Sequence, residues 1–511
     1  MAERFGTVTK PLASRAGNAL TWKIVQLVGV KLIFLARVFV LGRMLGPGEF
    51  GLFAVSLVAL DFLLKITDFG MVPALVQRPG AERRHYDAAW TVGLLRAGLV
   101  ALAVFAAAPF IADLFKEPRA TDLVRVLALR PLLDAGASIG VAQLTRQLRF
   151  RPLAWIQFSD AIVGTALSIA LVEPLGVWAL VAGPLAGSLT SLIVSYILAP
   201  HRARLSLDTE AMLPLLRYGR WIFARALVAP LGTAMLQLAI TRQVGVAELG
   251  LYFLACKVAF LPTEVASGVI GAVAFPLYAR LQDNLRQATR TFQLILTGMF
   301  AVLLPAALLL FVLAPALVEH VLGPRWQGTV PVIRVLVWVN VVGLVGDAII
   351  PVLKGLGRPS RVTLLGVIQS GLLILLAWEF SGRFGAVGAG LTWLVATGAT
   401  QVLGIYLLRQ LLPQVWVGIA PSVAAIVAAS LAGAAAAWGI VRLEAGLAGL
   451  VAAIAASGLI TIGLFWTLDR WLKLNLARNL ARAFPEVVTA WTLVTRFPRP
   501  RSAAPPEGGL K

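Results

Sequence analysis

The stretch LGPGEFGLF at residues 45–53 occurs a second time, in altered form, as VGVAELGLY at residues 244–252. At an offset of 199 residues the shared positions are Gly46 with Gly245, Glu49 with Glu248, Gly51 with Gly250 and Leu52 with Leu251. Two upstream positions also align, as Trp22 with Trp221 and Arg43 with Arg242. Each stretch lies between two apolar runs of helix length. The alignment therefore indicates an internal repeat, in which a second unit follows the pattern of the first.

A second pair of stretches supports the repeat. LVRVLAL at 123–129 aligns with VIRVLVW at 332–338 at a nearby offset and places Arg125 on Arg334. Chance similarity between apolar segments is the alternative, and it explains one match more easily than two in the same order. The repeat predicts that helices 1 and 2 correspond to helices 7 and 8, and helix 4 to helix 10. Because the two units are six helices apart, they share one orientation in the membrane.

Composition sets the class of protein. Of the 511 residues 59% are hydrophobic and 14% are charged, and the mean hydropathy is +0.85. Apolar runs long enough to cross a bilayer core of roughly 30 Å recur along the chain, which predicts a polytopic helical membrane protein. They are too long and too continuous for the alternating strands of a membrane barrel. The single cysteine, Cys256, excludes a disulfide within the chain.

We predict fourteen spans, near residues 19–43, 49–70, 87–112, 122–145, 152–173, 176–199, 219–242, 247–276, 290–316, 329–354, 361–380, 385–409, 416–440 and 446–468. The net charge of +21 suits nucleic acid in a soluble protein, but here we expect no nucleic-acid partner. Loop arginines collect on one side when both termini are placed in the cytoplasm, as the positive-inside rule requires. Clusters such as Arg83-Arg84 and Arg149-Phe150-Arg151 then lie in inner loops.

These spans predict an all-α fold of two pseudo-symmetric six-helix lobes and two further helices. The expected divisions are 1–200 for the N-lobe, 201–411 for the C-lobe, 412–469 for helices 13 and 14, and 470–511 for the tail. Apolar and basic residues alternate in 470–495 as in a helix lying on the inner membrane surface. The last residues, 496–511, have the composition of a disordered segment.

The repeated turn has its own chemistry. Gly46 and Pro47 end one helix, and Glu49 falls in the first turn of the next, where the helix dipole favours an anion. We interpret the turn as a hairpin hinge at the outer face, present once in each lobe. Its two glutamates are interpreted as helix caps rather than ligands.

With these features the chain resembles the MOP transporter superfamily, and within it the Wzx-type polysaccharide flippases, which move undecaprenyl-linked oligosaccharides. The segments that carry the resemblance are LGPGEFGLFAV (45–55), ITDFGMVPALVQRP (66–79), FPLYARLQD (275–283), LGPRWQGTVPVIRVL (322–336) and KGLGRPSR (354–361). It covers residues 15–410 and leaves out the tail. Lipid II flippases share the fold and remain an alternative, as do drug or cation antiporters of the MATE type.

Charged residues within predicted spans are functional candidates because a charge at mid-bilayer costs at least about 2.5 kcal/mol. We expect the cations to line a water-filled cavity and bind the pyrophosphate of the substrate. They are Lys31, Lys65, Arg96, Arg130, Arg225, Lys257, Lys23 and Arg37. For Lys23 and Arg37, near opposite ends of helix 1, the alternative is snorkelling to the headgroups. Asp134 is expected to pair with Arg130 at i, i+4.

Acidic residues within the spans raise the question of coupling. The chain has no GxxxxGK[ST] loop, so we expect an ion gradient rather than ATP as the energy source. The candidates for carrying H⁺ or Na⁺ are Asp61, Asp68, Asp160, Glu264 and Asp347. The alternative for each is a fixed salt bridge, and Asp61 can pair with Lys65 at i, i+4.

Enzyme chemistry is not expected. The three histidines, His85, His201 and His320, fall in predicted loops or helix ends, and no pattern of metal ligands or cofactor binding is present. A glycan polymerase or ligase, which would belong to another class, needs a long outer loop that the sequence lacks. We therefore expect a monomeric, ion-coupled flippase of the bacterial inner membrane, in contact with membrane lipids and with the polysaccharide polymerase or export machinery.

Overall fold

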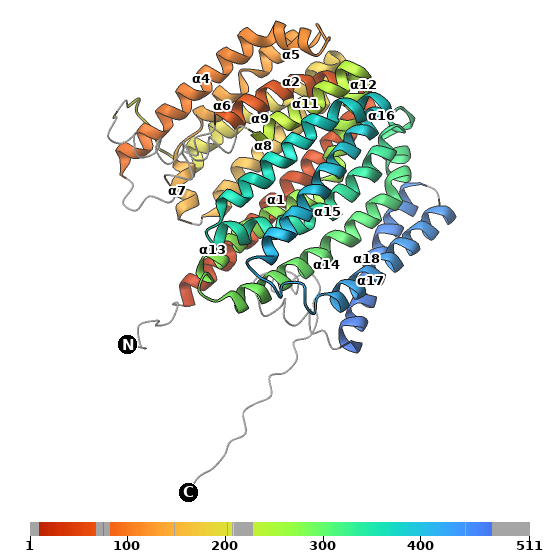
Figure 1. Ribbon diagram of the computed structural model, residues 1–511. Coiled ribbons are helices and arrows are strands. Elements are labelled where there is room, and N and C mark those ends of the chain that lie inside the picture. Colours follow the sequence, from red (N-terminus) through yellow and green to blue (C-terminus); the bar gives the residue numbers. More distant parts are fainter. Residues whose placement is uncertain are drawn as a thin grey trace.

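The computed structural model describes residues 10–67, 75, 82–147, 149–201, 203–206, 208, 228–444 and 446–472. These residues form helices, and the described ranges contain no strand (Figure 1). The N-terminal part holds α1 (Lys10–Met44), α2 (Pro47–Ile66), α4 (Arg83–Leu114), α5 (Ala120–Leu127), α6 (Arg130–Gly136), α7 (Gly140–Arg146), α8 (Phe150–Leu175), η1 (Gly176–Trp178) and α9 (Ala179–Leu198). The rest holds α11 (Val228–Gln243), α12 (Val246–Ala259), α13 (Leu261–Arg280), α14 (Leu285–Leu317), η2 (Val318–Leu322), η3 (Pro324–Trp326), α15 (Thr329–Gly355), α16 (Pro359–Arg409), α17 (Ala420–Leu443) and α18 (Leu447–Trp471).

Many of these helices are long enough to span a membrane. In the described ranges eight are long and apolar enough to cross a bilayer, and the bent pair α12–α13 makes a ninth. Two of the eight, Phe150–Leu198 and Pro359–Arg409, have 49 and 51 residues, more than twice the roughly 20 that a span needs. Each turns at a glycine with positive φ, Gly176 (φ 54°) and Gly385 (φ 58°). The predicted helical membrane fold is confirmed, and the count of fourteen spans stays a prediction.

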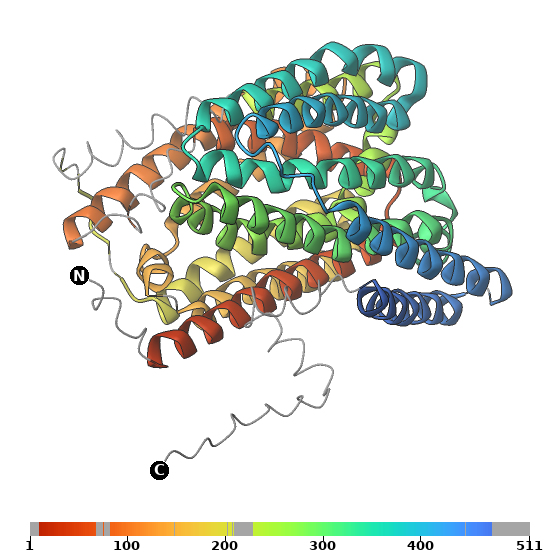
Figure 2. The ribbon, with the colours of Figure 1, turned by 60° about the horizontal axis from the view of Figure 1, so that its bottom comes forward.

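Helix packing divides most of the bundle into two lobes. We call α1 to α9 the N-lobe and α11 to α16 the C-lobe. Within the N-lobe α8 packs on α9 and α1, and within the C-lobe α16 packs on α11 and α15. The hairpin α17–α18 packs on α14 at the outside of the C-lobe, as Figure 2 shows in blue. The start of α1 and the end of α18 lie at the same end of the bundle (Figure 1).

The tertiary contacts reproduce the repeat. Arg125 on α5 stacks over Phe105 on α4, with 5.5 Å from the guanidinium carbon to the ring centroid. Its counterpart Arg334 on α15 stacks over Phe311 on α14 at 5.2 Å. Both arginines thus contact the preceding long helix of their own lobe in the same way. Two distant segments have kept one local environment, which supports the repeat over chance similarity.

The lobes differ where helix 4 was predicted. Residues 122–145 were expected to form one helix, but they form the end of α5, then α6 and α7, whereas the C-lobe counterpart α15 is continuous over 27 residues. Backbone groups freed by the breaks need partners at membrane depth. Ser195 Oγ accepts a hydrogen bond from Ser138 N at 2.8 Å, and Tyr196 donates to Gly136 O at 3.1 Å. Helix α9 therefore stabilises the broken segment.

Predicted helix 8 is also broken. It bends by 45° between α12 and α13, next to Phe260 and Pro262. Proline lacks an N–H and favours the first turn of a helix, so Pro262 marks the start of a new helix. Asn340 on α15 donates to the buried carbonyl of Ala259 at 2.7 Å. The neighbouring helix α15 therefore satisfies a backbone carbonyl at the break.

Candidate functional site

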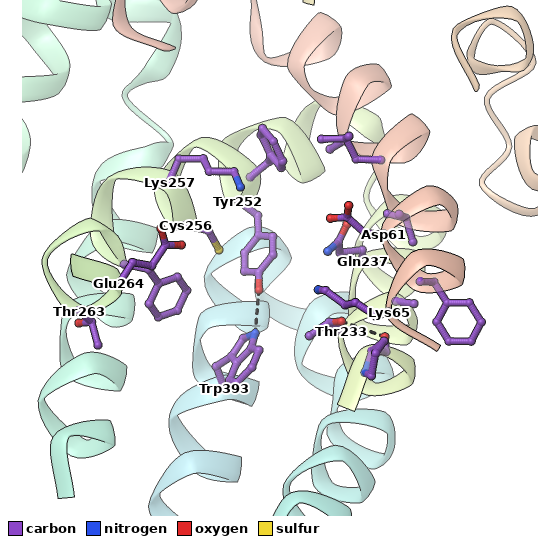
Figure 3. Close-up of a pocket in the computed structure, with 18 of the residues that line it drawn as sticks. Asp61, Lys65, Thr233, Gln237, Tyr252, Cys256, Lys257, Thr263, Glu264 and Trp393 are labelled. Atoms are coloured by element: carbon purple, nitrogen blue, oxygen red, sulfur yellow. Dashed lines mark hydrogen bonds between the residues drawn. The ribbon is translucent and has the colours of Figure 1, made fainter. Parts of the chain in front are cut away.

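A cavity of ≈ 550 Å³ lies between the two lobes. Its walls come from α2 on the N-lobe side and from α11, α12, α13, α15 and α16 on the C-lobe side (Figure 3). Its charged lining residues are Asp61, Lys65, Lys257, Glu264 and Asp347. All five were predicted from the sequence as charged residues within spans. The cavity is within the volume range of small-molecule sites.

The N-lobe wall presents Asp61 and Lys65 from one face of α2. Both side chains are exposed toward the cavity, and Gln237 and Thr233 of α11 lie beside them (Figure 3). Asp61 and Lys65 form no ion pair with each other, although their i, i+4 spacing allows one. The fixed salt bridge considered from the sequence is therefore absent for this pair. Both charges are free to meet a polar ligand.

The C-lobe wall combines a lysine with aromatic rings. The ammonium of Lys257 lies 5.0 Å from the ring centroid of Phe253 and 5.8 Å from that of Phe34, which belongs to α1 of the other lobe. Tyr252 accepts a hydrogen bond from Trp393 Nε1 at 2.8 Å, and both residues line the cavity. Stacking on a ring attracts a cation without neutralising it. The two rings therefore position the Lys257 ammonium at the cavity wall.

An ion pair joins the lobes at the edge of the cavity. Lys31 of α1 pairs with Glu264 of α13. The side chains are 37% and 46% exposed, so water screens the attraction and the pair can exchange partners. Glu264 lies in the first turn of α13, where the helix dipole favours an anion. The sequence singled out both residues but gave no indication that they meet.

Asp347 is the most enclosed of the acids in the cavity wall. Its carboxylate accepts a hydrogen bond from Ser267 Oγ of α13 at 3.0 Å. Asp347 belongs to α15, so this hydrogen bond connects α13 to α15. Among the described residues, no arginine or lysine forms an ion pair with this carboxylate.

The other predicted residues that the structure describes do not line this cavity. Arg130 pairs with Asp134 at 3.6 Å, as predicted, and Arg37 and Asp160 are close enough to interact electrostatically with Arg130. This group lies within the N-lobe, on α1, α6 and α8. Arg37 also stacks over Phe34 at 4.9 Å. Most of the predicted charges that the structure describes therefore form two separate sets, one between the lobes and one inside the N-lobe.

Lys23 lies near the start of α1, with its ammonium 5.8 Å from the ring of Phe150 on α8. Arg96 is half-buried on α4 and is not part of the cavity lining. Asp68 and Arg225 lie outside the described residues. Neither they nor the predicted amphipathic helix at 470–495, of which only the first residues are described, can be placed.

The cavity differs from the expected cationic one. Among the described residues that line it, two lysines face three carboxylates, so the charge is mixed rather than uniformly positive. The neutral polar and aromatic lining of the cavity was not predicted from the sequence, and it includes Thr233, Gln237, Tyr252, Thr263, Ser267 and Trp393. A neutral polar residue can be selected from the sequence only if its type is uncommon within apolar runs. Thr, Ser and Tyr are common within such runs, so they gave no signal.

The repeated glutamates are helix caps, as predicted, but of different helices. Glu49 Oε2 accepts from Gly46 N at 2.9 Å and caps its own helix α2. Glu248 Oε2 accepts from Ala386 N at 2.9 Å, directly after Gly385, and caps the second half of α16. Both carboxylates satisfy free N–H groups at a helix start. The hairpin therefore contributes structure rather than ligands.

Several known proteins are similar to this chain. Residues 40–331 match the family described as "Polysaccharide biosynthesis protein". The lipopolysaccharide biosynthesis protein WzxC of Escherichia coli (strain K12) is 26% identical over 404 residues, covering 78% of this chain and 81% of WzxC. The succinoglycan biosynthesis transport protein ExoT of Rhizobium meliloti (strain 1021) is 24% identical over 388 residues, covering 75% of this chain and 78% of ExoT.

Solved structures show the same fold. The lipid II flippase MurJ, in an inward closed conformation, superposes with a TM-score of 0.67 at 12% identity and covers 88% of this chain and 98% of its own. An inward-facing MATE multidrug transporter of the MOP superfamily superposes with a TM-score of 0.62 at 17% identity and covers 77% and 98%. These likenesses confirm the two-lobed MOP fold. Because the match extends over more than half of its length, the chain belongs to the polysaccharide biosynthesis protein family, and its relatives include WzxC and the transport protein ExoT.

Proposed function

We propose that the protein flips undecaprenyl-pyrophosphate-linked oligosaccharides across the bacterial inner membrane for the biosynthesis of an exopolysaccharide, capsule or O-antigen. The observation that carries the proposal is the cavity between the lobes, with Lys65 on one wall and Lys257 on the other (Figure 3). A diphosphate needs cations that approach from more than one side, and lysine provides point charges with rotatable donors. The named relatives WzxC and ExoT serve lipopolysaccharide and succinoglycan biosynthesis.

The lining suits both parts of such a substrate. The lysines would hold the diphosphate, and the rings of Trp393, Phe253 and Phe260 would pack against sugar faces. The hydroxyl and amide groups of Thr233 and Gln237 would bond to sugar hydroxyls. Polyprenyl carbons would stay in the bilayer, outside the cavity. The protein would then carry only the polar head across, which is the part that the bilayer excludes.

The mixed charge of the cavity supports coupling to an ion. Asp61, Glu264 and Asp347 repel an anionic substrate unless H⁺ or Na⁺ neutralises them. We propose that one of these carboxylates carries the coupling ion and that the transport cycle alternates access to the two sides. Both termini would lie in the cytoplasm, as the loop charges predict. We further propose that the protein acts as a monomer beside the polymerase or export machinery.

Lipid II flipping is the second candidate, and the likeness to MurJ favours it. The distinction rests on the sugar head rather than on the fold, because both substrates share the polyprenyl diphosphate. Relatives found by sequence serve surface polysaccharides, so we favour the first candidate.

The test is an accumulation experiment in the host. After deletion of the gene, undecaprenyl-linked intermediates are measured by mass spectrometry, and the strain is complemented with wild type, Lys65→Gln, Lys257→Gln or the control Arg383→Gln. Arg383 is an exposed residue paired with Glu379 outside the cavity. We expect viable cells that accumulate a complete repeat unit on the lipid and lose surface polysaccharide, with rescue by wild type and the control only. Accumulated lipid II with loss of viability would favour the second candidate, and unchanged lipid intermediates would refute both.

A further inference from the structure

The two copies of the repeated turn contact each other across the lobes. Helix α2 crosses α12 where Gly51 faces the carbonyl of Val246 and Gly250 faces the carbonyl of Pro47. At the offset of 199 residues these are the same contact seen from either side, because Gly51 aligns with Gly250 and Pro47 with Val246. A Cβ atom at either glycine would overlap the facing carbonyl. The repeated glycines therefore permit the close approach of two backbones.

The repeated arginines make a second reciprocal contact beside the crossing. Arg43 of the N-lobe donates from Nη1 to the carbonyl of His320 at 3.1 Å, at the C-terminal end of the C-lobe helix formed by α14 and η2. Arg242 of the C-lobe donates from Nε to the carbonyl of Leu114, the last residue of the N-lobe helix α4. Free carbonyls and the helix dipole make a helix C-terminus attractive to a cation. Each lobe thus caps the third long helix of the other.

Trp326 strengthens the joint from the C-lobe side only. It is fully buried, donates from Nε1 to the carbonyl of Gly42 at 2.6 Å, and packs edge-on against Phe50 with 5.1 Å between ring centroids. Gly42 and Phe50 belong to α1 and α2 of the N-lobe. Trp326 comes from the LGPRWQG segment, which the repeated turn does not include. It adds buried apolar area to a contact that the glycines and arginines define.

This joint closes one end of the cavity. The lining begins at Ala54 on α2 and at Tyr252 on α12, within one helical turn of the crossing glycines, and continues away from them to Lys65 and Glu264. Along the sequence, the chain passes from the N-lobe to the C-lobe after α9, outside the joint. At the joint the lobes are held by non-covalent contacts alone, so they are free to separate there.

We infer that the two copies of the turn form a clasp that closes the outer end of the cavity and opens to release the transported head. The clasp consists of Gly51 and Gly250, which allow the helices to meet, and Arg43 and Arg242, which hold the closed state. This inference rests on the proposed function for the identity of the transported group. It rests on the predicted topology for the assignment of this end of the cavity to the outer side. The competing interpretation is a permanent joint about which the lobes pivot.

Cysteine labelling separates the two interpretations. Cys256 is the single cysteine, so Cys256→Ala gives a cysteine-free protein, and Leu57→Cys then places a reporter in the cavity wall. A membrane-impermeant maleimide is applied to spheroplasts, which expose the outer side, and to inside-out vesicles. We expect the reporter to react from the inner side and only slowly from the outer side. Arg43→Gln and Arg242→Gln should each raise the outer rate about tenfold, because each removes a charge-assisted hydrogen bond from the closed state.

Gly51→Ala and Gly250→Ala should raise the outer rate further and by similar factors, since the two contacts are equivalent. The matched controls are Gly48→Ala, where an added Cβ meets no atom within 4 Å, and Arg383→Gln, which removes another outer charge. Unchanged outer rates in the arginine variants, with normal labelling from the inner side, would overturn the clasp, and so would an equal rise in the Gly48→Ala control. The arginine variants decide the matter if an alanine variant does not fold. Labelling needs no substrate, so failure of the clasp would leave the flippase proposal standing.

Discussion

Lys31 of α1 and Glu264 of α13 form an ion pair that joins the two lobes, 233 residues apart in sequence. Glu264 lies 14 residues beyond Gly250, the C-lobe glycine of the crossing, on the bent pair α12–α13. Leu27 of α1 lies close by, 3.4 Å from where a Cβ of Gly268 would stand. The lobes are therefore held together at two levels, by a tight joint at one end and by a solvated ion pair farther along.

The exposure of this pair predicts a functional effect without a large effect on stability. We expect Lys31→Glu and Glu264→Lys each to reduce surface polysaccharide at least several-fold, because like charges would then face each other across the lobes. The double reversal should restore part of the activity. Thermal unfolding in detergent should change by no more than about 1 kcal/mol, as for other exposed pairs. Complementation and thermal shift are the measurements, with Arg383→Glu/Glu379→Arg as the reversed control pair; full activity of both single variants would contradict the prediction.

Asp347 is the acid best placed to hold a coupling cation. Its carboxylate is largely enclosed and its hydrogen-bond donor among the described residues is Ser267. A cation that binds the folded protein stabilises it by about 2.7 kcal/mol at one hundred times Kd. We expect Na⁺ or acidification to raise the thermal midpoint of wild type, and Asp347→Asn to abolish that rise. Asp134→Asn, whose residue pairs with Arg130 inside the N-lobe, is the control. An ion response that survives in Asp347→Asn would assign the ion to another acid.

Trp393 has two separable contributions in the cavity wall. Trp393→Phe keeps a ring but loses the hydrogen bond to Tyr252, which should lower the free energy of unfolding by about 1 kcal/mol and leave transport nearly normal. Trp393→Ala should reduce surface polysaccharide strongly if the ring packs against sugar. Trp378→Ala is a matched control on the same helix, because Trp378 is 51% exposed and lies outside the cavity. Equal activities of the two alanine variants would argue against sugar contact.

Trp326 should dominate the stability of the joint. Its side chain is fully buried between the lobes, and truncation of a buried tryptophan to alanine costs about 3–5 kcal/mol. Trp326→Phe keeps the contact with Phe50 but loses the bond to the Gly42 carbonyl, which should cost about 1 kcal/mol. Thermal unfolding in detergent measures both. A stability loss in Trp326→Ala no larger than that in the exposed Trp378→Ala would contradict the burial.

Local pattern was sufficient for the class and architecture of the protein. Apolar runs of spanning length fix the transmembrane helices because a bilayer core excludes unpaired backbone groups. The aligned glycines, glutamates and arginines of residues 43–52 and 242–251 indicated a repeat, since a repeat leaves its pattern in the chain itself. The five charged residues of the cavity could also be identified as candidates from the sequence, because a charged residue within an apolar span is energetically costly and therefore rare.

Only the tertiary structure decided which of these residues meet. Glu49 and Glu248 align in sequence, yet one caps its own helix and the other caps α16, because each carboxylate bonds to whichever free N–H packing brings near. The spacing of charges along a helix shows which face they share, but not which helix that face contacts. The pairing of Lys31 with Glu264 and the position of Arg130 outside the cavity could therefore be seen only in the packed structure. The reciprocal crossing of Gly51 and Gly250 is the clearest case. The sequence repeated the turn, and the meeting of the two copies arises from the two-fold arrangement of the lobes.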